Sequence, residues 1–155
     1  MSFPFNIRVY GILIDHDRVL LSDEMINGKE YTKFPGGGLE FGEGTRDCLK
    51  REFLEEMNLS VEIGSHFYTT DYFQPSVFGN REQIISIYYY VVAPPCLTAI
   101  ATSNVPLFRV DRNNIHLNTE SYRFMPVEQF SEQSVTLPID KVAARLLKET
   151  FMLAK

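Results

Sequence analysis

Three glutamates lie within five residues of one another, at Glu52, Glu55 and Glu56. In a helix, residues three and four apart share a face, so Glu52 faces both of the other carboxylates. Each such like-charge pair costs about 0.2–0.5 kcal/mol on an exposed helix, and more in a partly dry cleft. Because the adjacent Arg51 cannot neutralise three acids, we expect a divalent cation among them. Carboxylates without histidine or cysteine nearby are hard oxygen ligands, which favours Mg²⁺ or Mn²⁺ over Zn²⁺.

A glycine-rich segment precedes these acids. It consists of Gly36, Gly37 and Gly38 after a proline, and we expect it to form a loop, since these residue types do not suit the interior of a helix or strand. Such a loop lets the backbone approach a ligand closely, and a glycine carbonyl can supply a further oxygen to a metal. Glu40 and Glu43 lie between the loop and the acidic segment. This combination suits metal-assisted attack of water on a phosphoanhydride, with a nearby glutamate taking the proton.

Hydrophobic periodicity predicts the elements that must position these residues. Thr45 to Met57 is predicted as a helix, with Thr45 as its N-cap and Asn58 as a left-handed residue at its end. The predicted strands cover residues 7–14, 18–22, 61–73, 84–92 and 121–127, and a second helix covers 141–152, with its start marked by Thr136 or Pro138. Residues 96–118 are expected to form a long loop or an inserted hairpin. This order of elements predicts a layered α/β or α+β domain.

Composition narrows the class of protein. A chain of 155 residues with 45% apolar and 23% charged residues fits one soluble domain over residues 1–155. The net charge of −5 argues against nucleic acid or an anionic membrane as the main partner. Two cysteines, Cys48 and Cys96, and the lack of a signal-peptide pattern predict a cytoplasmic protein with reduced thiols. Residues 83–108 carry no charge, but prolines interrupt them, so we expect no membrane span.

The segment from Gly37 to Leu59 resembles the Nudix box, whose pattern is G-x5-E-x7-R-E-U-x-E-E-x-G-U, where U is bulky and apolar. The chain departs from this pattern at Asn58, where glycine is usual, and both residue types tolerate the left-handed conformation. The matching polar and glycine positions are Gly37, Glu43, Arg51, Glu52, Glu55 and Glu56.

The resemblance implies a Nudix fold, in which a mixed sheet is sandwiched between helices. It also implies a metal-dependent diphosphohydrolase that cleaves a phosphoanhydride bond in a nucleoside diphosphate linked to another moiety. The implied ligands of Mg²⁺ or Mn²⁺ are Glu52, Glu55, Glu56 and the Gly37 carbonyl. Arg51 and Glu43 would form an ion pair that holds Glu52 in place.

The resemblance leaves the catalytic base and the substrate open. The base varies among family members, and the candidates here are Glu52, Glu82 and Glu120, the last from a loop before residue 121. Pro75, the sixteenth residue after Leu59, resembles a proline near that position in the family's ADP-ribose pyrophosphatases. It favours a nucleotide sugar such as ADP-ribose, while nucleoside triphosphates and dinucleoside polyphosphates remain alternatives.

Two other functions and one partner are also considered. A non-catalytic Nudix-like sensor of a nucleotide or sugar nucleotide would usually lack part of the glutamate set, which this chain keeps. The related isomerase of isoprenoid diphosphates uses an additional cysteine and glutamate, for which Cys48 and Cys96 give poor support. The uncharged stretch 83–108 is a candidate homodimer interface.

Overall fold

The computed structural model describes residues 2–79, 81–95 and 97–155. Contacts within the chain divide it into two compact units. Unit 1 consists of Met1–Leu13 and Pro35–Pro94, and unit 2 of Ile14–Phe34 and Pro95–Lys155. Cys96 lies outside the described residues, so the expectation of a reduced thiol there stays a prediction, as does a single domain over residues 1–155.

Unit 1 contains a mixed sheet. The parallel pairing of β1 with β6 runs from Phe5 opposite Gln83 to Leu13 opposite Val91, whereas β5 and β4 pair antiparallel with β6 and β1. The strand order is β5 (Glu62–Thr69), β6 (Gln83–Val92), β1 (Phe5–Asp15) and β4 (Gly36–Gly38). Together with the helices, this mixed pairing confirms the predicted α/β class.

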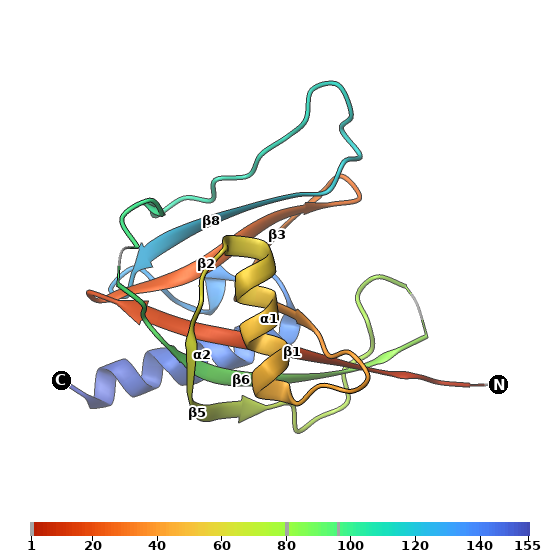
Figure 1. Ribbon diagram of the computed structural model, residues 1–155, viewed down its shortest axis with the longest axis horizontal. Helices are drawn as coiled ribbons and strands as arrows, with labels where there is room; N and C mark the ends of the chain where they lie inside the picture. The colour runs from red at the N-terminus through yellow and green to blue at the C-terminus, as the bar shows by residue number, and fades with distance from the viewer. Residues whose placement is uncertain (1, 80, 96) are drawn as a thin grey trace. The chain divides into compact units, whose positions relative to one another are not determined.

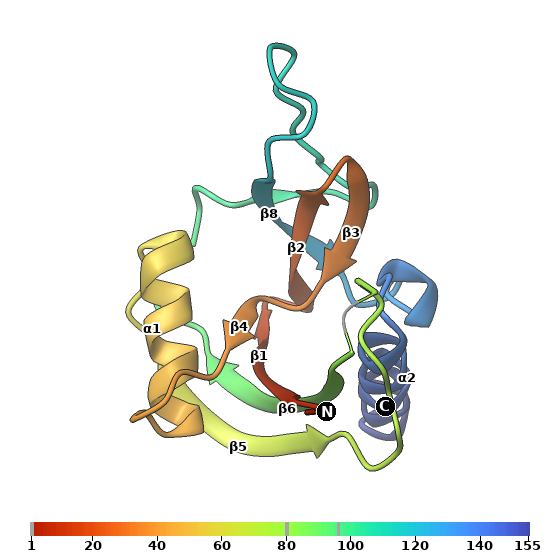
Figure 2. The same ribbon diagram turned by 90° about the vertical axis from the view of Figure 1, so that its right-hand side faces the viewer.

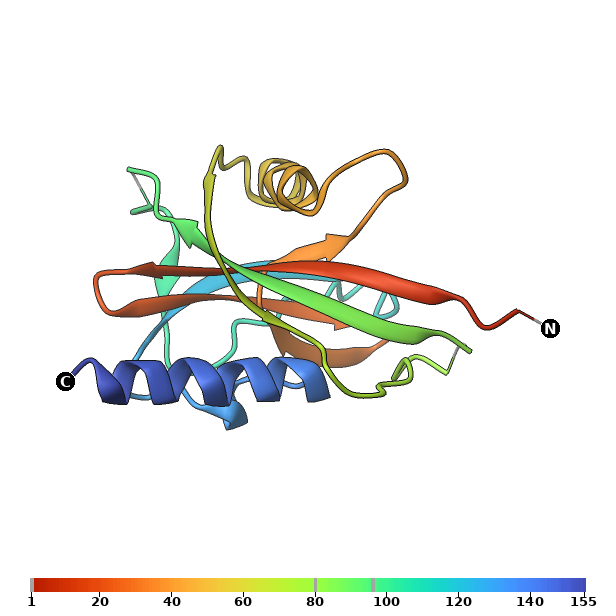
Figure 3. The same cartoon turned by 90° about the horizontal axis from the view of Figure 1, so that it is seen from below.

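Helix α1 (Thr45–Met57) lies on one face of the unit 1 sheet, and Figure 3 views it nearly end-on. The side chains of Leu49 and Phe53, both part of this helix, are buried. Gly11 on β1 makes room for this packing, because a Cβ there would lie 2.7 Å from the Phe53 ring. The expected left-handed end is confirmed, since Asn58 has φ 54° and ψ 34°.

The predicted N-cap is wrong by one residue. Gly44 occupies the cap position, and no side chain caps the helix. Thr45 is the first helical residue, and its hydroxyl instead hydrogen-bonds the Tyr89 hydroxyl at 2.7 Å. Arg46 donates to the carbonyl of Gly64 at 2.8 Å. These contacts fasten the start of α1 to β5 and β6.

In the sheet of unit 2, β2 lies between β3 and β8 and pairs antiparallel with both (Figure 2). The chain enters through a hairpin from the end of β1, with Asp15 opposite Arg18. The elements are β2 (Arg18–Ile26), β3 (Lys29–Lys33), β7 (Ala101–Thr102), β8 (Thr119–Pro126), the 3₁₀ helix η1 (Glu132–Ser134) and α2 (Pro138–Leu153).

One expectation about an irregular segment needs correction, and the long loop expected within residues 96–118 is confirmed over the described residues 97–118. Gly36–Gly38 are not a loop but the short strand β4, because their missing side chains let them lie tightly against β1. A Cβ on Gly36 would stand 2.0 Å from the Val9 carbonyl oxygen. Residues 97–118 contain the two-residue strand β7, which pairs parallel with β8, and then a long excursion (Figure 1). No inserted hairpin is present within these described residues.

The helices of the structure also bear on the question of a membrane span. Within the described part of the chain, no helix combines the length and the apolar character needed to cross a membrane.

Candidate active site

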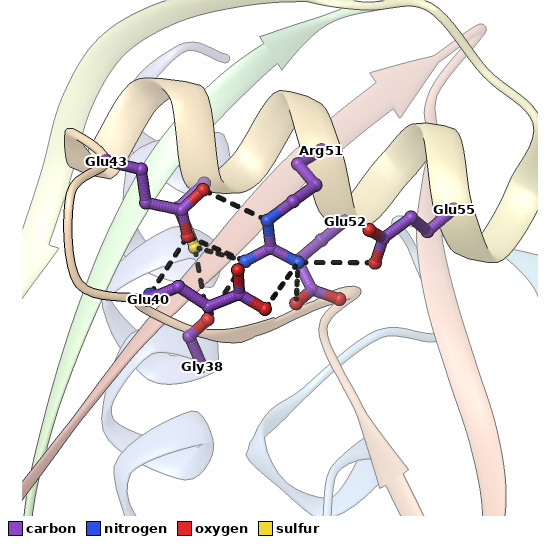
Figure 4. Close-up of polar contacts among 7 residues, drawn as sticks. Gly38, Glu40, Glu43, Arg51, Glu52 and Glu55 are labelled. Atoms are coloured by element: carbon purple, nitrogen blue, oxygen red, sulfur yellow. Dashed lines mark hydrogen bonds and ion pairs between the residues drawn. The ribbon is translucent and has the colours of Figure 1, made fainter.

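Arg51 is the centre of a charged cluster in unit 1, drawn in Figure 4. Its side chain leaves α1 and meets two oxygens of Glu43, at 3.0 and 2.7 Å. One further nitrogen donates to Glu52 at 2.9 Å and to Glu55 at 3.2 Å. The carboxylate of Glu40 lies 3.8 Å away. One guanidinium therefore faces four carboxylates, so negative charge is in excess around it.

Glu43 fixes the segment between β4 and α1. Its carboxylate accepts the backbone N–H of Glu40 at 2.9 Å as well as the two bonds from Arg51. The hydrogen bond from Arg51, followed by that from the Glu40 backbone, lowers the pKa of Glu43 to about 2. The same interaction raises the pKa of Arg51, so the pair stays charged at any physiological pH.

The carboxylate of Glu52 occupies the space that a side chain at position 37 would need. A Cβ on Gly37 would lie 2.4 Å from Cδ and Oε1 of Glu52. The Glu52 side chain is 12% exposed, against 60% for Glu55. The close approach of the Glu52 side chain therefore requires glycine at position 37. The sequence alone predicts a ligand, and not Glu52, as the group that approaches this glycine.

Cys48, on α1, contacts Arg51 of the charged cluster. Its thiol donates to the Gly38 carbonyl at 3.5 Å, and Arg51 donates to the same carbonyl at 3.1 Å. Burial, with the neighbouring Glu43 carboxylate, raises the pKa of Cys48 to about 12. The thiol is thus protonated at neutral pH and has no thiolate character for nucleophilic chemistry.

The donor set fits a hard divalent cation. Glu56 is half-buried on α1, four residues after Glu52 and so on the same face. With Glu55 and the Gly37 backbone, these residues offer only oxygen donors, as Mg²⁺ and Mn²⁺ prefer. Among the residues that the structure describes, no three acidic, histidine or cysteine side chains already form a metal-holding group.

The two other candidate bases lie apart in the chain. Glu82, in unit 1, accepts from the Asn6 amide at 3.1 Å. Glu120, in unit 2, is the second residue of β8 rather than part of a loop, because its strand begins earlier than the apolar pattern indicates. Its carboxylate accepts from the Tyr122 hydroxyl at 2.5 Å.

Sequence reasoning missed the contacts of Glu40, Gly38 and Cys48 with Arg51. The Cys48 contact has a sequence signal, because residues three apart on a helix are neighbours. The other two have none, since they depend on how the segment between β4 and α1 folds back.

A family model described as the NUDIX domain matches residues 4–147. The match spans nearly the whole chain, and the chain belongs to this family, whose members are the Nudix hydrolases. It is thus an enzyme of the class that the Gly37–Leu59 spacing predicts. No curated protein matches the chain.

Solved structures agree on the fold. The E. coli ORF135 protein is 20% identical, with a TM-score of 0.63 over 98% of this chain and 91% of that chain. The MutT protein from Methanosarcina mazei Go1 is 18% identical, with a TM-score of 0.63 over 100% and 99%. A bifunctional NMN adenylyltransferase/ADP ribose pyrophosphatase from Francisella tularensis is 26% identical, with a TM-score of 0.50 over 60% of this chain and 28% of that one.

Proposed function

We propose that this Nudix hydrolase uses Mg²⁺ or Mn²⁺ to cleave a phosphoanhydride bond in a nucleoside diphosphate linked to another moiety. The observation that carries the proposal is the imbalance around Arg51, where one guanidinium faces four carboxylates. A divalent cation relieves that imbalance, and it attracts the phosphates that the acidic side chains would otherwise repel.

Glu52, Glu55, Glu56 and the Gly37 carbonyl would hold the cation. When bound, the metal screens the phosphate charges and lowers the pKa of a coordinated water. The chain's own part is to fix the donors. Arg51 and Glu43 keep Glu52 against Gly37, so that its carboxylate does not have to be ordered when the metal enters.

We assign the role of general base to Glu120, with Glu82 and Glu52 as the alternatives. The Tyr122 hydroxyl donates to Glu120 and so orients its carboxylate. Exchange of Glu120 for glutamine should lower turnover by about 10²–10⁴-fold, as expected for loss of a general base. A near-normal rate in this variant would transfer the role to Glu82 or Glu52.

A nucleotide sugar such as ADP-ribose is the favoured substrate, supported by Pro75 and by the similarity to the bifunctional NMN adenylyltransferase/ADP ribose pyrophosphatase from Francisella tularensis. Nucleoside triphosphates are the alternative. Cytoplasmic location and a homodimer through residues 83–108 also stay proposals, and the dimer can be checked by light scattering.

The test is a panel of nucleotide sugars and nucleoside triphosphates, incubated with Mg²⁺ or Mn²⁺ and scored by the products released. EDTA should abolish all product formation. A chain that binds a panel member equally well with and without chelator, and releases no product, would instead be the non-catalytic sensor.

A further inference from the structure

An exposed apolar surface lies at one end of the unit 1 sheet. Three chain segments meet there, because Phe5 of β1 stands opposite Gln83 of β6, and Pro75 pairs with Gln83 from the other side. The Gln83 N–H also donates to the Pro4 carbonyl at 3.0 Å, which extends the contact between the first two segments toward the N-terminus. Paired residues share a face of a sheet, and so do alternate positions of one strand. We refer to five exposed apolar residues of these segments as the phenylalanine patch: Phe3, Phe5, Phe73, Pro75 and Val77.

The phenylalanine patch reverses the usual alternation of a strand with one solvated face, in which apolar side chains point inward and polar ones outward. In residues 73–77 the apolar side chains are exposed, whereas Gln74 and Ser76 are half-buried. Likewise, Phe5 is exposed and its polar neighbour Asn6 is half-buried. Single exposed apolar residues need no explanation, but a contiguous group of them marks a surface that binds something.

The phenylalanine patch is the uncovered part of the sheet face on which α1 packs. Phe5, Ile7 and Gly11 stand at alternate positions of β1, and Gly11 faces the Phe53 ring of α1. Ile7 and its register partner Ile85 are only half-buried. Figure 3 shows both strands continuing past α1 toward the N-terminal end of β1. The apolar face is therefore longer than the helix that covers it.

The area of the phenylalanine patch matches one half of a dimer interface. Its three phenylalanines are 62–70% exposed, so at about 200 Å² each they present about 400 Å² of surface. Pro75 and Val77 add to this, which brings the patch to about 500 Å², near the upper limit for a monomer. A standard interface covers about 800 Å² per partner, of which about 65% is apolar in homodimers, again about 500 Å².

The distribution of charge favours a second copy of the chain on this face. The segments that form and border the patch, residues 2–7, 72–79 and 83–87, contain no charged side chain. The whole chain carries a net charge of −5, so most contacts between two copies would bring acidic groups together. A contact through the patch adds no such repulsion. A two-fold axis brings the same surface from both chains together, and an uncharged apolar surface is complementary to itself.

We propose that the phenylalanine patch is the interface through which two copies of this chain form a two-fold symmetric dimer. This interface differs from a dimer through residues 83–108, because its exposed side chains come from residues 3–5 and 73–77. The proposal does not depend on the proposed function and assigns no part of the hydrolysis to the second copy.

The test is sedimentation equilibrium of the full chain over a range of protein concentrations. The unmodified chain should dimerise with a dissociation constant of about 1 μM or below, since interfaces of this size range from micromolar to picomolar. Phe5→Glu places one charge from each copy in the contact and should raise the dissociation constant at least about a hundredfold. Phe73→Ser should raise it by about tenfold or more. Both side chains are exposed in the single chain, so both variants should fold, which circular dichroism verifies.

Val92→Ser is the matched control. Val92 is 58% exposed, as Phe5 nearly is, but it lies at the other end of β6 and within residues 83–108. Its replacement removes an exposed apolar side chain outside the phenylalanine patch. The dissociation constant of this variant should therefore equal that of the unmodified chain.

A chain that stays monomeric at concentrations about a hundredfold above the expected dissociation constant overturns the proposal. A dimer that persists in both patch variants, or that is lost in Val92→Ser, overturns it as well and moves the contact elsewhere. A monomer that instead sediments with phosphatidylcholine vesicles would assign the patch to a lipid surface, which also contradicts a dimer interface.

Discussion

Arg51 in unit 1 and Arg123 in unit 2 meet carboxylates in opposite ways. Arg123 is 1% exposed and pairs with the fully buried Asp23, at 2.7 Å. The oxygens of Asp23 also accept from the Thr32 hydroxyl at 2.7 Å and the Leu107 backbone at 2.8 Å. Arg51 is 22% exposed and faces four carboxylates.

The difference separates a structural pair from a proposed cation site. One positive group against one fully hydrogen-bonded negative group needs nothing further, and breaking such a pair leaves an uncompensated charge in the interior. Excess negative charge at a partly open position can still accept a cation. Arginine and carboxylate together therefore indicate neither role until the balance of charge and the exposure are known.

The largest effect on stability is expected at the buried pair. Asp23→Asn keeps the shape but leaves the Arg123 charge without its counter-ion, so the free energy of unfolding should fall by about 3–5 kcal/mol. Urea denaturation measures it. Turnover per folded molecule should change by less than about threefold, because Asp23 is not among the proposed catalytic or metal-binding residues. A loss below about 1 kcal/mol would contradict the structural assignment.

The largest effect on activity is expected at the charged cluster around Arg51. Glu56→Gln removes a charge from the proposed metal site and should lower turnover at least about a hundredfold, with the thermal midpoint nearly unchanged. Glu62→Gln is the control, since its side chain is 80% exposed on β5. Unchanged product release by the Glu56 variant would reject the metal assignment.

A smaller effect on activity is expected from Gly37→Ala. The added Cβ must displace the Glu52 carboxylate, which lies 2.4 Å from its position, and should lower turnover by about tenfold through misplacement of a ligand. Higher Mg²⁺ concentrations should restore part of the rate. At Gly44 the nearest atom to an added Cβ is 3.5 Å away, an ordinary contact, so Gly44→Ala is the matched control. Equal losses in both variants would argue against this account of Gly37.

The smallest effect is a pH dependence of stability. The pKa of Glu43 is about 2 in the folded chain, below its ordinary value of 4.5. Its contribution is therefore fully present above pH 4.5 and is lost as the pH falls toward 2. Glu43→Gln should show a flatter stability profile over this interval in urea titrations. Parallel profiles would mean that the Arg51–Glu43 pair does not favour folding.

The sequence was most informative where local signals agree. Leu49 and Phe53 define the buried face of α1, and Asn58 ends the helix. Helical spacing alone places the three glutamates at positions 52, 55 and 56. Because both the helix and the acidic cluster depend on residues close in the chain, they can be predicted without tertiary information.

The sequence-based prediction of strands failed where residues far apart in the chain determine the local structure. The sequence predicts a strand over residues 18–22, whereas Asp23 and Glu24, which are poor strand residues, also belong to β2. It continues to Ile26 because Arg123, a hundred positions away, and Lys33 supply the missing charges. Likewise, three glycines form β4 only because β1 lies alongside them and Glu52 fills the space above Gly37.

The long loop between β7 and β8 is hydrogen-bonded to the neighbouring strands at its base, and its tip forms turns of its own. At the base, the Leu107 backbone donates to Asp23 and the Arg109 side chain donates to the Glu120 carbonyl. At the tip, Asp111 and Asn114 close their own turns through backbone and side-chain hydrogen bonds, and the residues there are exposed. An epitope tag or a fluorescent label inserted between residues 112 and 116 should therefore be carried without loss of folding or turnover.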